Sequence, residues 1–403
     1  MRLNSGHLQK MEALAATGMP GAYKVLIFFL VQQVHGLNML GNIASSQSFA
    51  QILGFFTAIG WSSLILVRVA QAKTKKDCIE AFNRLAMMGG ITLILCVIGT
   101  MLIGALLGKV ENAFQASCWL AAWTLYQIPR HYFIALKAYR NALYLDAVVI
   151  GLSISSLIAV PAENVSFWLA MSMLTGGLAT CCFIQNNSKS KPPSISYEIK
   201  GLEFGLTNFL SGGISLSLIP LASYFEDEVF AGILSLFVSV ASIALLIPRS
   251  ISLSQLPQLA QNINDPISLS INAARMRRQI TVCNFFTSLV CFAIAGGILL
   301  HAQNSLDSSK LAPILLIVIL QNALSTQSLV DANMLMAKEK SRSLLKVNFL
   351  ASLIFFTIVA IAHLEVVSDS FLYICVTTAA LNLYRLLTIK HYAKPIYDSN
   401  KAL

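Results

Sequence analysis

The chain has 403 residues, of which 56% are hydrophobic and 11% are charged, and its 28 Lys and Arg against 18 Asp and Glu give a net charge of +10. Water-soluble domains carry about 25% charged residues, so this composition excludes a soluble fold of the same length. It indicates a polytopic membrane protein, in which each transmembrane helix needs about 20 mostly apolar residues.

Twelve apolar runs along the chain are long enough to cross a bilayer. In order they cover residues 22–41, 48–68, 85–107, 116–136, 147–162, 165–184, 202–222, 229–248, 280–301, 311–333, 347–364 and 371–391. The fold class that we predict is therefore an all-α membrane protein with about 12 transmembrane helices.

A polar break, QNNSKSKPPSISYEIK, separates the first six runs from the last six. Its prolines, serines and lysines are typical of a flexible linker. We predict an N-terminal six-helix half at 1–184, a cytoplasmic linker at 185–200 and a C-terminal six-helix half at 201–403. Six crossings per half give both halves the same orientation, so the two bundles are expected to enclose a central cavity.

Lys and Arg gather on one side of this arrangement. If the N-terminus is inside, the outer loops hold only Lys109 and Lys310, Arg130 lies within a span, and the other 25 of the 28 fall in inner segments. The positive-inside rule then predicts that both termini are cytoplasmic. The basic balance is explained by topology, and we expect a lipid bilayer and no nucleic acid as its partner.

The outer loops are too short to fold into a domain. An O-antigen polymerase or a glycosyltransferase would need a long external loop or an acidic metal motif at the membrane, whereas the clustered acids Glu226, Asp227 and Glu228 lie in a short outer turn. The sequence contains no nucleotide-binding loop, zinc-ligand spacing or nucleophile elbow. We therefore expect no enzyme activity, cofactor or metal.

Polar residues interrupt the first span. Gln33, His35 and Asn38 lie in a run of lipid length, where an unsatisfied hydrogen-bonding group costs on the order of 1 kcal/mol or more. Their side chains are expected to face the bundle interior or water. They are candidates for substrate contacts, with His35 as a proton carrier, and the alternative is hydrogen bonding between helices.

The seventh span carries a second polar and glycine-rich stretch. Asn208 precedes Gly212 and Gly213, and Gly weakens a helix by about 1 kcal/mol relative to Ala. This pattern predicts a bent or broken helix with Asn208 as a candidate substrate contact, and the alternative is close helix packing through small residues.

An acidic residue, Asp331, lies near the inner end of the tenth span. A carboxylate in the membrane is a candidate cation site, proton site or arginine partner. The alternative is an acid at the membrane surface that pairs with a lysine such as Lys338.

The fourth span contains the pair Pro129-Arg130. Arg130 lies about 14 residues, or roughly 21 Å, from the outer end of its span. Pro129 leaves the carbonyl of Leu125 without its helical donor, and in lipid such a group needs protein or water beside it. Either the arginine reaches the headgroups or it faces a wet cavity open to the cytoplasm. Three further cations are predicted at a similar depth: Arg249, Arg68 and Lys24. Such a ring of cations suits an anion such as pyrophosphate.

Two stretches resemble a known superfamily. LGNIASSQSFAQILGFFTAIGWSSLILVRVAQA looks like the opening of the polysaccharide branch of the multidrug/oligosaccharidyl-lipid/polysaccharide (MOP) exporters, with a Leu-Gly turn after the first span. ALKAYRNALYLDAV resembles the cytoplasmic exit of that branch's fourth helix. Within the branch, the likeness is to Wzx-type O-antigen flippases of bacterial inner membranes.

The resemblance implies a specific function. Such proteins move undecaprenyl-pyrophosphate-linked oligosaccharide to the periplasmic leaflet by alternating access, alongside the polymerase and chain-length proteins of lipopolysaccharide assembly. It implies that the pyrophosphate is bound by Arg130, Arg68, Arg249 and Lys24. Asp331 and His35 would then serve ion coupling.

A cation-coupled multidrug exporter of the same superfamily is the main alternative. That branch usually places carboxylates inside its helices. Because the first six predicted spans carry none near mid-membrane, the sequence favours an anionic substrate.

Overall fold

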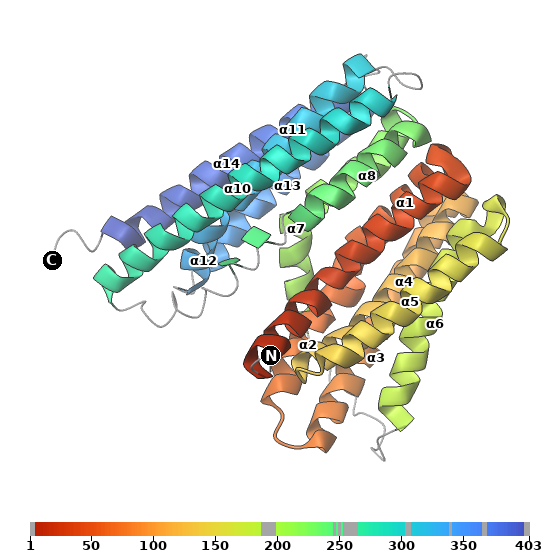
Figure 1. Ribbon diagram of the computed structural model, residues 1–403, viewed down its shortest axis with the longest axis horizontal. Helices are drawn as coiled ribbons and strands as arrows, with labels where there is room; N and C mark the ends of the chain where they lie inside the picture. Colours follow the sequence, from red (N-terminus) through yellow and green to blue (C-terminus); the bar gives the residue numbers. More distant parts are fainter. Residues whose placement is uncertain are drawn as a thin grey trace. The chain divides into compact units, whose positions relative to one another are not determined.

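The computed structural model describes residues 5–186, 199–244, 247–248, 251–252, 265–302, 308–337, 341–364 and 369–398. Within these residues the regular structure is entirely helical (Figure 1). The all-α prediction is therefore confirmed. By contacts the chain forms two compact units, Met1–Gly232 (unit 1) and Ile233–Leu403 (unit 2).

Unit 1 is built from seven long helices and two short helical segments, followed by the start of α8. They are α1 (Ser5–Gly54), η1 (Phe55–Ile59), α2 (Gly60–Gln71), α3 (Lys75–Leu106), α4 (Val110–Ala135), α5 (Tyr139–Ala159), η2 (Ala162–Asn164), α6 (Val165–Asn186), α7 (Lys200–Phe225) and α8 (Glu228–Ala244). α7 packs on α1 and α2, although the sequence assigns it to the second half. Residues 187–198 of the predicted linker lie outside the described residues, and the division into 1–184 and 201–403 stays a prediction.

Twelve crossings fit the described helices. Nine segments are long and apolar enough to span a membrane, and the first of them, Met11–Gln71, has 61 residues. A single helix of that length would measure about 90 Å, three times the hydrocarbon thickness, so this segment contains two crossings. With α4 and the shorter apolar helix Glu228–Ser242, the number agrees with the prediction.

The first two crossings meet at Gly36. Its backbone has φ 84° and ψ 176°, a conformation open almost only to glycine, and the residues on both sides are helical. The sequence predicts this turn at Leu40-Gly41, so its predicted position is wrong by four to five residues. Gly41 is instead helical and lies against the backbone of Glu228, where a Cβ would collide with the carbonyl.

The second crossing changes its winding at η1, a π-helical segment. The N–H of Gly60 donates to the carbonyl of Phe55, five residues earlier, and α-helical winding resumes in α2. α7 follows this crossing closely. Gly205 lies against the Phe55 carbonyl, and Gly201 lies against the ring of Trp61.

α7 is an unbroken helix from Lys200 to Phe225, so the predicted break at Gly212-Gly213 is wrong. Gly212 lies against the ring of Phe55. A Cβ added to Gly212 would stand 3.1 Å from the Phe55 Cζ atom. The alternative reading of these glycines, close helix packing, describes the contact.

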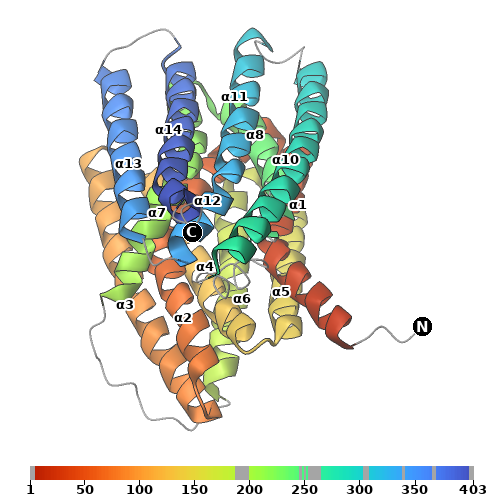
Figure 2. The ribbon, with the colours of Figure 1, turned by 90° about the vertical axis from the view of Figure 1, so that its left-hand side faces the viewer.

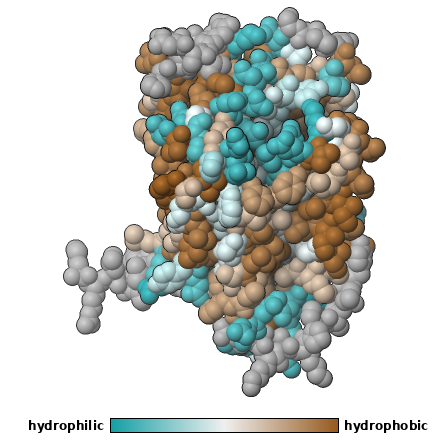
Figure 3. Space-filling model, turned by 90° about the vertical axis from the view of Figure 1, so that its right-hand side faces the viewer, coloured by the Kyte–Doolittle hydropathy of each residue, from teal (hydrophilic) through white to brown (hydrophobic). Residues whose placement is uncertain are grey.

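α3 faces the lipid along much of its length. It begins with a capping box, in which the Asp77 backbone N–H donates to the Thr74 hydroxyl and the Thr74 backbone N–H donates to the Asp77 carboxylate. This contributes about 1 kcal/mol. Farther along, Ile94, Leu95 and Leu102 are each about 60% exposed, as expected of side chains in contact with acyl chains. In Figure 3, broad apolar areas lie beside and below a hydrophilic patch in the upper centre of the view.

A hydrophobic core joins α2, α3, α4 and α5 in unit 1. Its largest members include Trp61, Phe82 and Tyr132, with Phe82 and Tyr132 in ring contact at 4.8 Å. Thr57 and Thr124 share a buried hydrogen bond of 2.7 Å between the second and fourth crossings. Trp119 of α4 donates to Ser166 of α6 at 3.1 Å. These contacts fix α4, which carries the Pro129-Arg130 pair, at the centre of unit 1.

Unit 2 contains α10 (Pro266–Ala302), α11 (Ser308–Gln327), α12 (Leu329–Ala337), α13 (Ser341–Leu364) and α14 (Ser370–Asp398). α14 packs on α11, α12 and α13, and α10 packs on α11 (Figure 2). A core that includes Met276, Val330 and Met334 holds the short helix α12 against α10.

Candidate functional site

Arg130 has a charged partner that the sequence did not predict. Its Nε lies 3.1 Å from Oδ1 of Asp146, on α5, and both side chains are buried, at 3% and 2% exposure. Because the arginine is surrounded by protein, it neither reaches for headgroups nor stands free in a cavity. The ion pair neutralises two charges that would otherwise be costly at this depth.

The pair belongs to a network that joins three helices. The Tyr126 hydroxyl donates to Asp146 at 2.5 Å, and a terminal nitrogen of Arg130 donates to the carbonyl of Ala16 on α1. The guanidinium also stands over the Tyr126 ring, 6.0 Å from its centroid. Arg130 thereby connects the inner part of α1 to α4 and α5.

The carbonyl that Pro129 leaves free is also covered by protein. A Cβ on Gly177 of α6 would lie 2.5 Å from the Leu125 oxygen, so the missing side chain lets the α6 backbone close over this group. From the sequence, protein or water is expected beside the Leu125 carbonyl. The close packing of α4 and α6 places protein there.

The predicted start of the fifth span left out a carboxylate that the structure buries in a helix. α5 begins at Tyr139, eight residues before the predicted start of the span at 147, and this places Asp146 inside the helix. Burying a lone carboxylate is costly, so the sequence places Asp146 in the loop before the span. The arginine partner, which the sequence does not show, makes its burial possible.

Unit 2 holds a second buried carboxylate with an arginine. Asp331 of α12 is 3% exposed and accepts a hydrogen bond of 2.8 Å from Arg277 of α10, whose side chain is 44% exposed. Lys338, the partner considered from sequence, lies outside the described residues. Among those residues, Asp146 and Asp331 are the two buried carboxylates, and each is paired with arginine.

Two of the other three predicted cations lie within the described residues. Lys24 is half-buried on α1, with its amine 5.2 Å from the centroid of the Phe28 ring, and Arg68 is half-buried near the end of α2. Arg249 lies outside the described residues. Because the Arg130 guanidinium is enclosed by protein, Arg130 does not belong to the predicted ring of four cations that face a cavity, and this part of the prediction is corrected.

The polar residues of the first span flank the turn. Gln33 and Asn38 are exposed on either side of Gly36, at the end of the crossing and not deep within it. His35 is half-buried, with Nε2 3.4 Å from the carbonyl of Leu157 on α5. Asn208 is half-buried on α7 and donates to the carbonyl of Phe204 at 2.9 Å. Their predicted roles in substrate binding and ion coupling stay predictions.

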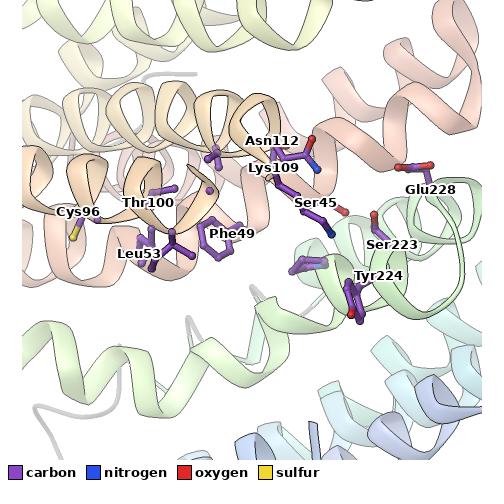
Figure 4. A pocket seen from close by; sticks show the side chains of 17 residues that line it. Ser45, Phe49, Leu53, Cys96, Thr100, Lys109, Asn112, Ser223, Tyr224 and Glu228 are labelled. Atoms are coloured by element: carbon purple, nitrogen blue, oxygen red, sulfur yellow. The ribbon is translucent and has the colours of Figure 1, made fainter. Parts of the chain in front are cut away.

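Unit 1 also contains a cavity of about 630 Å³ that the sequence did not predict. Figure 4 shows it between the second, third, fourth, seventh and eighth crossings, with the Lys109 side chain extending toward Ser223 and Tyr224. It is lined by Ser45, Ser46, Phe49, Leu53, Cys96, Gly99, Thr100, Ile103, Gly104, Lys109, Asn112, Ala113, Ala116, Pro220, Ser223, Tyr224 and Glu228. The one signal in the sequence was Lys109, a cation in an outer loop.

Comparison with family models and with curated protein sequences gives no match to this chain. Solved structures do match over almost its whole length. An inward-facing multidrug resistance MATE family transporter of the MOP superfamily has a TM-score of 0.65 at 12% identity, covering 98% of this chain and 96% of that one. The MATE multidrug transporter DinF-BH in complex with R6G has a TM-score of 0.61 at 12% identity, covering 97% and 96%.

A third structure is a MOP superfamily transporter from Pyrococcus furiosus, described as having a binding pocket of reverse polarity that suggests a different function. It has a TM-score of 0.57 at 13% identity, covering 97% of this chain and 95% of that one. The chain therefore has the fold of these transporters, and the predicted MOP-like architecture is confirmed at the level of the fold.

Proposed function

We propose that the protein is an alternating-access transporter, and not an enzyme, that moves an undecaprenyl-pyrophosphate-linked oligosaccharide across the bacterial inner membrane. The apolar helices and the match in fold to MOP superfamily transporters support transport in a multi-pass membrane protein. Two resemblances in sequence, at residues 40–72 and 135–148, support the lipid-linked cargo.

The pairing of the buried carboxylates is the observation that carries the choice of cargo. Asp146 and Asp331 each have an arginine partner, so neither charge is left to attract a cationic drug or a coupling ion in this conformation. A carboxylate without a protein partner attracts an organic cation more strongly than one that is already paired with arginine. Compensated acids instead favour an anionic or neutral cargo.

Cations at the inner ends of the helices are the proposed contacts for the pyrophosphate. Lys24 and Arg68 are half-buried and are proposed to bind its oxygens together with Arg249. Arg130 acts differently in this proposal. It positions the inner part of α1 through the Ala16 carbonyl and does not touch the cargo.

Multidrug export is the second candidate. It is favoured by one specific observation, the match in fold to a multidrug transporter that was solved with R6G bound. In that case the paired carboxylates would have to separate from their arginines before a cation could bind.

A reconstitution experiment separates the two candidates. The purified protein would be placed in proteoliposomes with either a fluorescent undecaprenyl-pyrophosphate oligosaccharide or rhodamine 6G, and translocation would be followed by quenching from outside. We expect movement of the lipid-linked sugar, reduced at least fivefold by Arg68→Gln and by Lys24→Gln. Rhodamine transport without movement of the sugar would replace the first candidate by the second.

A topology experiment tests the proposed orientation. Single cysteines introduced at 73–76 and at 109 would be treated in intact cells with a thiol reagent that does not cross membranes. Labelling at 109 and protection at 73–76 are expected if both termini are cytoplasmic, and the reverse pattern would overturn the orientation. Association with a polymerase and chain-length partners is part of the same proposal and is testable by cross-linking in cells.

A further inference from the structure

We infer that the cavity of unit 1 is a binding site for one phospholipid whose headgroup carries both a phosphate and an amine. This inference concerns the cavity of Figure 4, and does not depend on which cargo the protein transports. Its volume of about 630 Å³ lies in the usual range of small-molecule sites, and its lining combines apolar and polar side chains.

The position of Lys109 is the first argument. It is one of two cations in the predicted outer loops, where the positive-inside rule disfavours them. The other, Lys310, is paired with Asp369 at 3.6 Å. In the described part of the chain Lys109 has no carboxylate within ion-pair distance. Its amine instead stands 5.4 Å from the centroid of the Tyr224 ring, which holds it at the cavity without neutralising it.

A carboxylate on the same cavity selects the headgroup. Glu228 lines the wall formed by the start of α8 and has no ion-pair partner among the described residues. A simple anion would be attracted by Lys109 and repelled by Glu228. A headgroup with a phosphate and a primary amine matches both charges at once, as in phosphatidylethanolamine.

The remaining lining suits the glycerol and acyl part of such a lipid. Phe49, Leu53 and Ile103 provide apolar walls, and Phe49 and Ile103 are 40% and 59% exposed, so the cavity is open on the side of these residues. The Ser45 hydroxyl is shielded from solvent and has no hydrogen-bond partner in the described residues. An ester or phosphate oxygen of an occupant would supply the missing partner once the hydroxyl turns toward the cavity.

The test is lipid binding by the full-length protein in detergent, measured by native mass spectrometry. The lipids to compare are phosphatidylethanolamine, phosphatidylglycerol and undecaprenyl phosphate, with free phosphoethanolamine as the headgroup alone. We expect phosphatidylethanolamine to bind at least fivefold more tightly than the other three. Equal binding of phosphatidylglycerol or undecaprenyl phosphate would overturn the amine contact, and equal binding of phosphoethanolamine would overturn the lipid assignment.

Matched variants connect the binding to the cavity. Lys109→Gln should weaken phosphatidylethanolamine binding at least fivefold, while Lys310→Gln, at the other outer cation, should leave it unchanged. Glu228→Gln should remove the preference over phosphatidylglycerol. Equal effects of the two lysine variants would contradict the inference.

A pair of glycine variants keeps the test independent of these charges. Gly99 and Gly90 both lie on α3 with no atom within 4 Å of an added Cβ, but only Gly99 lines the cavity. Gly99→Leu should fill the cavity and reduce binding at least fivefold, and Gly90→Leu should not. Unchanged binding in the Gly99 variant would rule out this cavity as the site.

Discussion

Arg130 and Asp146, sixteen residues apart on successive helices, form a buried ion pair 3.1 Å long at the centre of unit 1. A charge that looked exceptional in the sequence is thus neutralised inside the protein. Its partner stands in the second stretch that resembles the polysaccharide exporters, and the tyrosine one turn before the arginine also binds that partner.

The first prediction concerns the cost of breaking this pair. Arg130→Ala and Asp146→Ala should each lower the free energy of unfolding by about 3–5 kcal/mol, because each leaves a buried charge uncompensated. The double variant Arg130→Met with Asp146→Leu should lose less than the sum of the single variants. Thermal unfolding in detergent measures the loss.

The control for this prediction is an exposed pair. Arg140 binds Glu12 at 2.7 Å, with the arginine side chain 66% exposed, and Arg140→Ala should leave the unfolding temperature almost unchanged because water screens the pair. Equal losses for Arg130→Ala and Arg140→Ala would contradict the structural role given to burial.

The second prediction compares the two buried acids. Asp331→Asn should destabilise the protein less than Asp146→Asn, because the Arg277 side chain is 44% exposed and can turn to water, whereas the Arg130 side chain is 4% exposed. Unfolding temperatures of the two asparagine variants in the same detergent give the comparison. A larger loss at Asp331 would show that unit 2 depends on its pair in a way that exposure does not explain.

The third prediction concerns the closure of α6 over α4. Gly177→Ala should cost about 1–3 kcal/mol, since the added methyl would stand 2.5 Å from the Leu125 carbonyl oxygen and must push the helices apart. Gly151→Ala on α5, where an added Cβ meets nothing within 4 Å, is the matched control. It should be neutral or slightly stabilising, and circular dichroism melts distinguish the two.

The fourth prediction tests the first turn. Gly36→Ala should destabilise by about 1–3 kcal/mol because an alanine is strained at φ 84° and ψ 176°. The same change at Gly90, inside α3 and without close neighbours, should stabilise the helix by up to about 1 kcal/mol. A neutral Gly36→Ala would contradict the turn at this residue.

Much of the fold followed from the sequence. The number of crossings and the all-helical class depend on apolar length, a signal that every span carries within its own residues. The boundary of the fifth span failed because Asp146 was counted as loop. Apolar length alone cannot recognise an acid whose charge is cancelled by another helix.

The site was less accessible to sequence reasoning. Arg130 was identified as exceptional, but its partners Asp146 and Ala16 come from two other helices, and no local pattern connects them. The cavity depends on five helices that are far apart in the chain. Lys109 marked its position only as an unexpected outer cation, and the aromatic ring beside it is more than a hundred residues away.

The π-helical segment Phe55–Ile59 sets the rotational phase of everything that follows it on the second crossing. One residue in an α-helix corresponds to about 100° of rotation, and a π-helical turn holds about one residue more than an α-helical turn, so rewinding this segment as regular α-helix without removing a residue would turn α2 by about that amount. Trp61 would then leave Gly201, and the guanidinium of Arg68 would point in another direction. The register in which the inner half of this crossing presents its side chains is thus fixed by five residues in its middle.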